Sequence, residues 1–421
     1  MHVKHHKTCR ICGNEHLTEV LDLGRQYIQG AFEHPNSPSP PRRQISNRIV
    51  RCDTSKDENA CGLVQADVSI SPEILYRNYW YQSGISQTMT KHLRSIVEEA
   101  VAITGFKDGQ VVDIAANDFS LLRNYRDYGN FKMVAIDPSN ISAQQKDSDI
   151  ALINDVFPNK KAKTFNASIV TSIACFYDVN EPESFALGIK NILNKDGVWI
   201  AEFAYWPSML TNLAYDQILH EHVCHYYLAP FERLLFNTGL KLFRAEKTPT
   251  NGGSIMCYIC HDSCDKYENK DWTSNLRQLR FEEFEAELDE ESTYLKFRED
   301  VRRSLYDLKF LVEKINEDGG TIHLYGSSTK VNVTLQAANI GPDQISFAAE
   351  RSESKWGAST LSGIKIIDEE TSRSLKPTHY LCSLIGFKKE ILEREKTFLD
   401  NGGTFIFLPE LTLVDKNTKN D

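Results

Sequence analysis

The stretch Val111–Leu122, VVDIAANDFSLL, is the feature that most constrains how this 421-residue chain can fold. Apolar residues lead to Asp113, small residues follow, and Asn117-Asp118 precede an apolar helical start. This order predicts a buried parallel strand, a tight turn and the N-terminus of a helix. The small residues would let a ligand approach backbone N–H groups, and the helix end would add a positive partial charge.

A second predicted strand, Met133–Ile136, ends in Asp137. A carboxylate at the end of the second strand can accept hydrogen bonds from both ribose hydroxyls of an adenosine ligand. A small-residue loop followed by such an acid is the usual layout of an S-adenosylmethionine (SAM) or dinucleotide site. The alternative is an ordinary strand–turn–helix unit, and these residues alone leave it open.

Length and composition limit the class of protein. A chain of 421 residues predicts two or three domains, and 41% hydrophobic with 25% charged residues is normal for a globular protein. The net charge of −10 argues against broad binding of nucleic acid or anionic membranes, but permits a local basic pocket for a phosphate. The chain has no apolar run that would span a bilayer, and MHVKHHKTC lacks the apolar part of a secretion signal. We therefore expect a cytoplasmic protein.

Four of the ten cysteines lie early in the chain: Cys9, Cys12, Cys52 and Cys61. The first two form a knuckle with two residues between them, whereas eight residues separate the second two. This polar insert can loop out without moving either sulfur, because lengthening a loop costs little. Four thiolates suit tetrahedral Zn²⁺ with no open position, so a structural zinc site is predicted. The alternative is that Cys61 is a free buried thiol.

A second group, Cys257, Cys260, His261 and Cys264, looks like a set of ligands by composition only. Cys257 and Cys260 belong to the predicted strand Ile255–Cys260, which would point them to opposite faces. We expect buried and surface thiols at these positions rather than a second metal site.

Alternating strands and helices fill most of the remaining chain. The charged region Lys270–Glu317 predicts a helical hairpin between two α/β units. Alternation of this kind predicts doubly wound sheets with ligands at the carboxyl ends of the strands. The other predicted strands are Ile150–Ile153, Ala167–Ile173, Gly197–Glu202, Leu240–Glu246, Gly253–Ile259, Thr321–Tyr325, Ile345–Ala349, Tyr380–Ile385 and Thr404–Phe407.

The sequence His220-Glu221-His222 follows the fifth strand of the first unit. A histidine titrates near neutrality and can take a proton, and a neighbouring carboxylate can orient a ring or stabilise imidazolium. The spacing does not match the helical HExxH pair of a zinc site. A surface turn is the alternative interpretation.

Two further stretches are candidates for substrate contacts. Tyr76–Gln87 is aromatic and short of charge, which is typical of interdomain packing or of a substrate cleft. Gly326–Lys330, GSSTK, is a small-residue turn with a lysine at a helix start. It suits a phosphate but lacks the spacing of a nucleotide-hydrolysing loop, and a plain strand–helix turn is equally compatible with it.

With these pieces in order, the chain resembles the three-domain nucleotide-sugar C-methyltransferases of deoxysugar pathways. The resemblance spans nearly the full length and rests on CRICG, YWYQSGISQTM, VVDIAANDFSLL, IDPS, YDQILHEH, NGGS, LYGSSTK and ERSESKWG. It implies an α/β protein with a zinc module at 1–70 and a Rossmann-like class I SAM methyltransferase core at 71–265. A helical linker and a second Rossmann-like α/β domain would follow at 266–421.

The resemblance implies methylation of a carbon in a nucleotide-linked 4-keto-deoxysugar. A base would remove the proton beside the ketone, and the enolate would take the methyl group of SAM. His222 matches the base, with Glu221 beside it, and Tyr79 or Tyr81 matches a tyrosine near the sugar. The implied SAM contacts are Asp113, Ala115, Asn117, Asp137, Asp155 and Ala174. The implied substrate contacts are His220, Ser328, Lys330, Arg351 and Lys355, and the two C-terminal turns would hold the diphosphate.

Two departures from the family pattern affect these expectations. Ala115 and Phe119 stand where the family has glycines, and Phe119 is expected to reshape the SAM pocket. Leu219 stands where the family often has tyrosine, so enolate stabilisation would have to come from elsewhere, with Tyr79 or Tyr81 as candidates. Methylation of a sugar oxygen, or non-catalytic binding of a sugar nucleotide, are the alternatives. We expect a monomer or weak homodimer that binds neither nucleic acid nor membranes.

Overall fold

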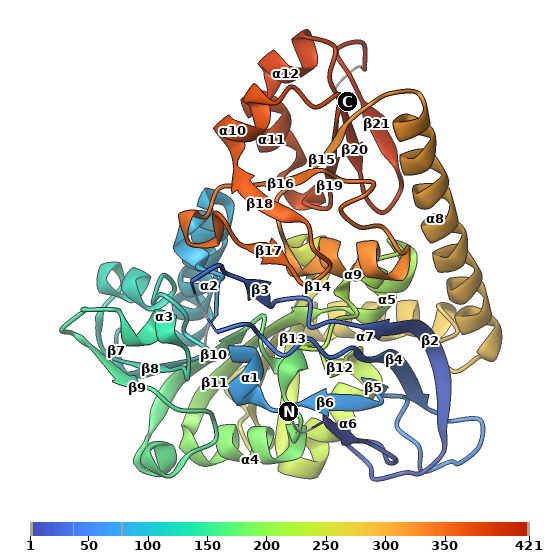
Figure 1. The fold of residues 1–421 in the computed structure, drawn as a ribbon. Coiled ribbons are helices and arrows are strands. Elements are labelled where there is room, and N and C mark those ends of the chain that lie inside the picture. The colour runs from blue at the N-terminus through green and yellow to red at the C-terminus, as the bar shows by residue number, and fades with distance from the viewer. Residues whose placement is uncertain (1–2, 37, 77–78, 419–421) are drawn as a thin grey trace.

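The computed structural model describes residues 3–36, 38–76 and 79–418 (Figure 1). Positions 77 and 78 of the predicted aromatic segment lie outside the described residues. The described strands form sheets of two, four, seven and eight strands. Figure 1 shows the C-terminal sheet at the top, the central sheet below it and the N-terminal strands across the lower front.

The central sheet has the order β13-β14-β11-β10-β7-β8-β9. Its strands β7 to β11 run parallel, and β14 pairs antiparallel with β11 and β13. The predicted doubly wound core with a closing hairpin is therefore confirmed. The strands are β7 (Asp108–Ile114), β8 (Asn130–Ile136), β9 (Ile150–Ile153), β10 (Ala167–Ile173), β11 (Leu193–Ala204), β13 (Leu240–Thr248) and β14 (Ser254–His261).

Helices cover both faces of this sheet because its strands are apolar on both sides. Val111 belongs to the buried cluster that contains the inner face of α2 (Gln87–Thr104), and Val112 belongs to the opposite cluster. Cys257 and Cys260 likewise face opposite clusters, as the strand period predicts. Both thiols are fully buried, so neither is a surface thiol. The other central helices are α3 (Asn140–Ala143), α4 (Pro182–Ile192), α5 (Trp206–Thr211) and α6 (Leu228–Thr238).

The loop after β7 is not followed by the predicted α-helix. A 3-10 helix, η2 (Leu122–Asp127), stands there instead. Ala115, Asn117 and Phe119 all have positive φ, at 59°, 50° and 63°, so the chain turns repeatedly before it can begin a helix. The expected α-helix dipole therefore does not act at this loop. The backbone N–H groups of the loop itself are the hydrogen-bond donors offered to a ligand.

The C-terminal sheet has the order β21-β20-β19-β15-β16-β18-β17-β3, with five parallel strands at its centre. It confirms the predicted second α/β unit, and its last helical region is divided into α11 and α12. The strands are β15 (Ile322–Tyr325), β16 (Phe347–Glu350), β17 (Ser359–Thr360), β18 (Lys365–Asp368), β19 (His379–Cys382), β20 (Thr404–Phe407) and β21 (Thr412–Val414). The helices are α9 (Thr329–Ala337), α10 (Glu369–Ser374), α11 (Lys388–Arg394) and α12 (Lys396–Asp400).

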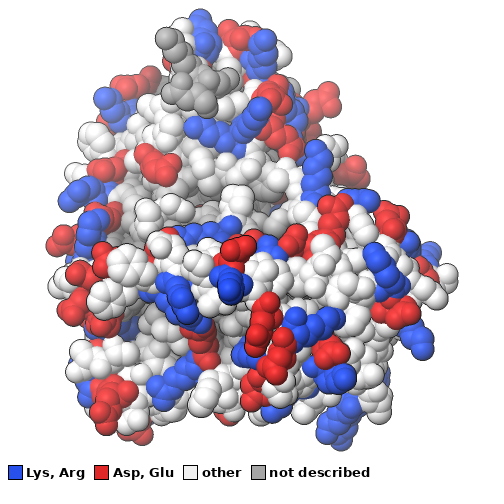
Figure 2. Space-filling model, turned by 180° about the vertical axis from the view of Figure 1, so that it is seen from behind, with Lys and Arg blue, Asp and Glu red and all other residues white. Residues whose placement is uncertain are grey.

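The predicted helical hairpin is confirmed as α7 (Lys270–Glu285) and α8 (Glu291–Glu317), and α8 runs along one side of the C-terminal sheet (Figure 1). No described helix is both long and apolar enough to cross a membrane. Figure 2 shows positive and negative side chains interspersed over the rear face, without a broad area of one sign.

The N-terminal strands reach into both α/β units. Within the four-stranded sheet, β12 from the central region pairs with β5, and β3 pairs with β17 at the edge of the C-terminal sheet. The N-terminal region thus contributes an edge strand to the eight-stranded sheet and takes a strand of the central region into its own four-stranded sheet. Its elements are β1 (Val3–His5), β2 (Leu17–Gln26), β3 (Phe32–Glu33), β4 (Ile45–Cys52), β5 (Val64–Ala66), β6 (Val68–Ile70) and α1 (Pro72–Tyr76), and β12 is Cys224–His225.

Candidate functional site

The four early cysteines meet in space. Their sulfurs all lie within 4.8 Å of one another, with 3.4 Å between Cys9 and Cys61 and 3.5 Å between Cys12 and Cys52. A tetrahedral ion with Zn–S bonds near 2.3 Å separates its sulfurs by about 3.8 Å. Gly13, at φ 71°, lets the first knuckle turn, and the Cys61 N–H donates to the Cys52 sulfur. The pKa of the Cys12 thiol is lowered because the other three thiols donate hydrogen bonds to it. The residues fit a structural zinc ion.

Asp137 stands at the end of β8, as predicted, and both of its oxygens are held by backbone. Oδ2 accepts the N–H of Asn117 at 2.8 Å, and Oδ1 accepts the N–H of Ser139 at 2.7 Å. Each oxygen keeps a second lone pair for a ribose hydroxyl. Asp113 lies beside it: Thr171 donates to it at 2.6 Å, and burial together with the charge of Asp137 raises its pKa to about 7. The acid and loop fit an adenosine ligand.

The loop residues expected to contact SAM differ in where their side chains lie. Ala115 and Ala174 both have positive φ at the ends of β7 and β10, and they present only small side chains there. Phe119 is buried in the cluster that includes Leu93 of α2, so its ring is part of the core. Asp155 is exposed after β9, and its Oδ1 accepts the N–H of Val156.

The aromatic segment is tied to this loop. The Asn117 side chain donates to the carbonyl of Tyr81 at 2.9 Å and accepts the N–H of Ser83 at 3.1 Å. Asp118 accepts the N–H of Gly84 at 2.7 Å. Tyr81 is 47% exposed, and its backbone carbonyl rather than its phenol makes the contact. The segment is therefore joined to the donor side of the site.

His222 is buried with a defined tautomer. Its Nδ1 lies 2.8 Å from the carbonyl oxygen of Gln217, which can only accept, so Nδ1 carries the proton and Nε2 keeps a lone pair. The ring packs against that of Tyr177, with centroids 4.0 Å apart. Burial lowers the pKa of His222 well below its ordinary value, and the charges of His225 and Lys330 lower it further. The ring is therefore neutral at pH 7 and can act as a base.

Acidic and phenolic groups gather beside His222. Burial raises the pKa of Glu221 to about 7, and the Glu221 Oε1 lies so close to Gly30 that a Cβ there would come within 2.5 Å of it. Burial and the charge of Glu221 raise the pKa of Asp178. Burial and both carboxyls raise the pKa of Tyr79 and Tyr76. Sequence reasoning missed Asp178, although its position just after β10, at the carboxyl edge of the sheet, was the available signal.

His220 lies toward the N-terminal strands rather than toward this cluster. Its Nε2 is 3.2 Å from the carbonyl of Ser46, and its N–H donates to the Gln29 side chain. Burial lowers the pKa of His220 to about 4. Leu219 is buried in the core and offers no hydroxyl. Neighbouring residues of the HEH stretch thus face different parts of the protein.

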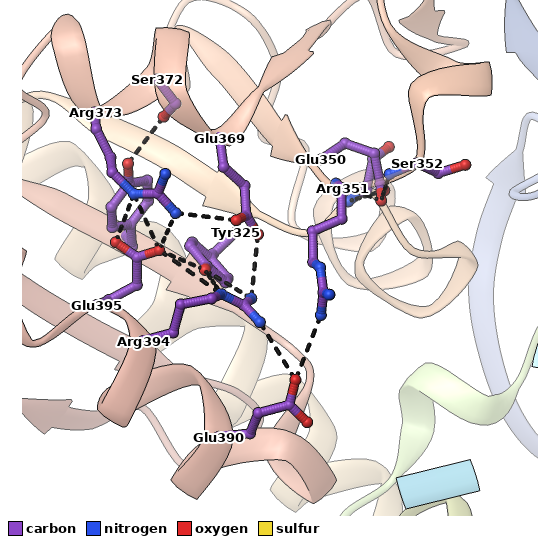
Figure 3. Close-up of polar contacts among 12 residues, drawn as sticks. Tyr325, Glu350, Arg351, Ser352, Glu369, Ser372, Arg373, Glu390, Arg394 and Glu395 are labelled. Atoms are coloured by element: carbon purple, nitrogen blue, oxygen red, sulfur yellow. Dashed lines mark hydrogen bonds and ion pairs between the residues drawn. The ribbon is translucent and has the colours of Figure 1, made fainter. Parts of the chain in front are cut away.

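The C-terminal turn repeats the acid-and-loop arrangement. Glu350 ends β16, and it accepts the N–H groups of Ser327 and Ser352 at 3.1 and 3.0 Å. The Lys355 ammonium donates to the Ser327 carbonyl at 2.9 Å and to Glu350 at 3.3 Å. Arg351 reaches away to Glu390, which also pairs with Arg394 (Figure 3). Lys355 therefore places a cation against this turn, whereas the Arg351 guanidinium lies at Glu390.

Ser328 and Lys330 lie on the same turn but have separate surroundings. The Ser328 hydroxyl caps α9 by accepting the N–H of Val331 and lies 3.1 Å from that of Ser383. Lys330 reaches in the other direction, to Asn251, at 3.5 Å. Burial lowers the pKa of Lys330, while the nearby charge of Asp216 opposes that shift.

Comparison with known proteins agrees with this geometry. Family models match residues 9–76 (a zinc binding domain), 86–245 (a methyltransferase domain) and 249–409 (a C-methyltransferase C-terminal domain). The chain is 26% identical over 416 residues to the C-methyltransferase NovU of Streptomyces niveus, and the match covers 96% of each chain.

Solved structures show weaker likeness. A SAM-dependent methyltransferase from Clostridium acetobutylicum is 12% identical, with a TM-score of 0.33 over 41% of this chain and 92% of its own. Magnesium protoporphyrin IX methyltransferase from Synechocystis, with bound S-adenosylhomocysteine (SAH), is 16% identical, with a TM-score of 0.33 over 41% and 82%. Since both TM-scores are low, the assignment rests on the sequence matches and the cysteine cluster: the chain is assigned as a SAM-dependent C-methyltransferase with a structural zinc site.

Proposed function

We propose that this enzyme methylates a carbon beside the ketone of a nucleotide-linked 4-keto-deoxysugar. The observation that carries the proposal is the state of His222. Its Nδ1 proton is held by the Gln217 carbonyl, so the neutral ring offers Nε2 as a proton acceptor inside a buried cluster. Methylation of a hydroxyl does not require a proton to be removed from carbon. Methylation of carbon does, and it needs a base such as His222.

The residues of the chain would divide the work as follows. Nε2 of His222 takes the proton beside the ketone, while the bond to Gln217 keeps the ring in place. A carboxylate at Glu221 stabilises the imidazolium that forms. SAM, when bound against Asp137, supplies a methyl group activated by its sulfonium. Asn117 contacts both Asp137 and the aromatic segment at Tyr81, and so fixes the two relative to each other. Methyl transfer requires such alignment of donor and acceptor.

The C-terminal turn supports a nucleotide diphosphate as the handle of the substrate. Lys355 and Arg351 provide positive charge, and Glu350 is placed as a ribose-binding acid is in a nucleotide site. This assignment keeps the division into a zinc module (1–70), a SAM core (71–265) and a C-terminal unit (266–421), with the sugar where the last two meet.

A direct assay tests the proposal. The protein is incubated with SAM and a panel of nucleotide-linked 4-keto sugars, and products are followed by mass spectrometry. We expect a gain of one CH₂ unit, located on carbon by NMR. A methyl group found on oxygen, or a sugar nucleotide that binds without being methylated, would contradict the proposal and favour one of the alternatives.

A further inference from the structure

Removal of a proton beside a ketone places negative charge on the ketone oxygen, and a protein must stabilise it. The two tyrosines that the sequence offers for this role, Tyr79 and Tyr81, are poorly placed for it. Tyr81 exposes 47% of its surface and contacts the loop through its backbone. Tyr79 lies among the carboxyls of Glu221 and Asp178, whose negative charge opposes a second anion. Leu219 has no polar atom. A cation from another element would supply the positive charge that these three residues do not.

Lys330 comes from α9 of the C-terminal unit and is connected to His222 through a short chain of contacts. Its Nζ lies 3.5 Å from Oδ1 of Asn251. The carbonyl of Asn251 accepts the Gln217 side chain at 2.5 Å, and the carbonyl of Gln217 accepts the His222 ring. Two residues therefore separate the ammonium group from the imidazole.

The backbone around Asn251 supports this placement. Asn251 has φ 56° within η6 (Thr250–Gly252), a conformation that asparagine tolerates better than most residues. The turn exposes its carbonyl to Gln217 and its amide to Lys330. The NGGS stretch is thus a bridge between the two α/β units at the base.

The charged groups around Lys330 agree with a position near His222. The positive charge of Lys330 lowers the pKa of His222, so the two groups lie close enough to interact. The charge of Asp216 raises the pKa of Lys330 against the effect of burial. The other cations of the C-terminal turn, Lys355 and Arg351, point to Glu350 and Glu390 instead.

We propose that Lys330 is a catalytic residue whose ammonium group stabilises the enolate oxygen, rather than a contact to the diphosphate. The inference rests on the proposed function. As Nε2 of His222 takes the proton, the C–H electron pair forms the C=C bond, and the carbonyl π pair moves onto oxygen, which accepts a hydrogen bond from Nζ. When the carbon bonds to the methyl group, the ketone re-forms and the S–CH₃ electron pair stays on sulfur, giving SAH.

Solvent exchange separates this role from phosphate binding. The keto sugar that the enzyme accepts is placed, unmethylated, in D₂O with SAH instead of SAM. Deuterium entry at the carbon beside the ketone is then measured at saturating sugar. Lys330→Met should lower exchange and kcat by roughly 10²–10³, the scale for losing one oxyanion donor. Its dissociation constant for the sugar nucleotide should stay within about threefold of wild type, since the diphosphate contacts are intact.

Lys355→Met is the matched control, because it removes a cation from the same turn. It should weaken nucleotide binding more than Lys330→Met does, and lower exchange at saturation far less than Lys330→Met does. Lys330→Gln and Lys330→Arg guard against a misfolded variant: Gln should behave as Met does, and Arg should recover part of the exchange. If Lys330→Met exchanges at the wild-type rate but binds weakly, Lys330 is a phosphate contact and the inference is overturned. If the wild type binds the keto sugar but neither exchanges nor methylates it, the proposed function is overturned and no enolate remains to be stabilised.

Discussion

The two α/β units hold an acidic residue in the same way. Asp137 ends the second strand of the central unit, and Glu350 ends the second strand of the C-terminal unit. In each, one oxygen accepts an N–H from the loop after the first strand, and the other accepts the N–H two residues further along. The same strand order and loop geometry produce the same hydrogen bonds, although the loop sequences DIAAND and YGSST differ.

The units differ in the charge around that acid. Lys355 pairs with Glu350 and also holds the carbonyl of Ser327. Within residues 3–36, 38–76 and 79–418, no salt bridge reaches Asp137. An acid with no paired cation is free to accept hydroxyl groups, whereas a neutralised acid with a cation beside it suits an anionic ligand. Under the proposed function, this difference favours the donor nucleoside in the first unit and a phosphate-bearing ligand in the second.

The largest expected effect is at His222, where the two units meet. His222→Ala should lower turnover by roughly 10²–10⁴, the usual scale for losing a general base, while SAH binding persists. His220→Ala is the matched control and should change turnover far less, since its ring contacts Ser46. Steady-state kinetics and calorimetry measure both. Equal losses in the two variants would mean that the HEH stretch acts as a structural unit.

Loss of zinc should disturb both units, because the N-terminal strands pair with each. Cys12→Ser should fall from about one equivalent of zinc to well below it, and thermal unfolding should begin roughly 10 °C lower. Elemental analysis and calorimetry check this. Full metal content and unchanged unfolding in the variant would contradict the four-cysteine site.

The comparison itself predicts crossed binding defects. Asp137→Ala should weaken SAH binding by about 1.5–3 kcal/mol, because a charged hydrogen-bond acceptor is lost, and leave nucleoside diphosphate binding unchanged. Glu350→Ala should have the smaller effect, about 1 kcal/mol or less on nucleoside diphosphate binding, because it also frees Lys355 to contact phosphate. Titration calorimetry with both ligands measures this. If Asp137→Ala weakened the binding of both SAH and the nucleoside diphosphate, the two sites would not be separate.

The last expected effect is on the pH dependence of stability, at Glu221. Its pKa is raised from 4.5 to about 7 by burial, so the folded state keeps a proton that the unfolded state has lost between these values. Stability should therefore fall as pH rises through that window, by about 3 kcal/mol at most. Glu221→Gln should remove this pH dependence. The free energy of unfolding of the variant, measured with denaturant, should therefore rise relative to that of wild type between pH 5 and 8.

Asp178→Asn is the control for this measurement, since burial raises the pKa of Asp178 in the same direction. The effect of Glu221→Gln should persist in its presence. A difference between wild type and Glu221→Gln that is the same at pH 5 and pH 8 would show that Glu221 is not desolvated as the geometry indicates.

Local sequence determined the two α/β units, the position of Asp137 and the cysteine cluster. The apolar runs and the acids that follow them predict both α/β units, and Asp137 lies where the pattern places it. The spacing of Cys9, Cys12, Cys52 and Cys61 predicts the cluster, because one knuckle and one looped-out pair need only one approach to meet. These features depend on neighbours along the chain, and period and spacing record them directly.

Tertiary structure alone decided the rest. The residues before η2 adopt left-handed conformations that replace a predicted helix, and β3 and β12 join sheets formed by distant segments. His220 and His222, two residues apart, face the N-terminal strands and the site, respectively, and Lys330 is linked to the base only because α9 brings it to Asn251 of the NGGS turn. Such pairings join residues that are far apart in sequence, so no local periodicity encodes them. Burial then sets the protonation of His222 and Glu221, and burial exists only in the folded chain.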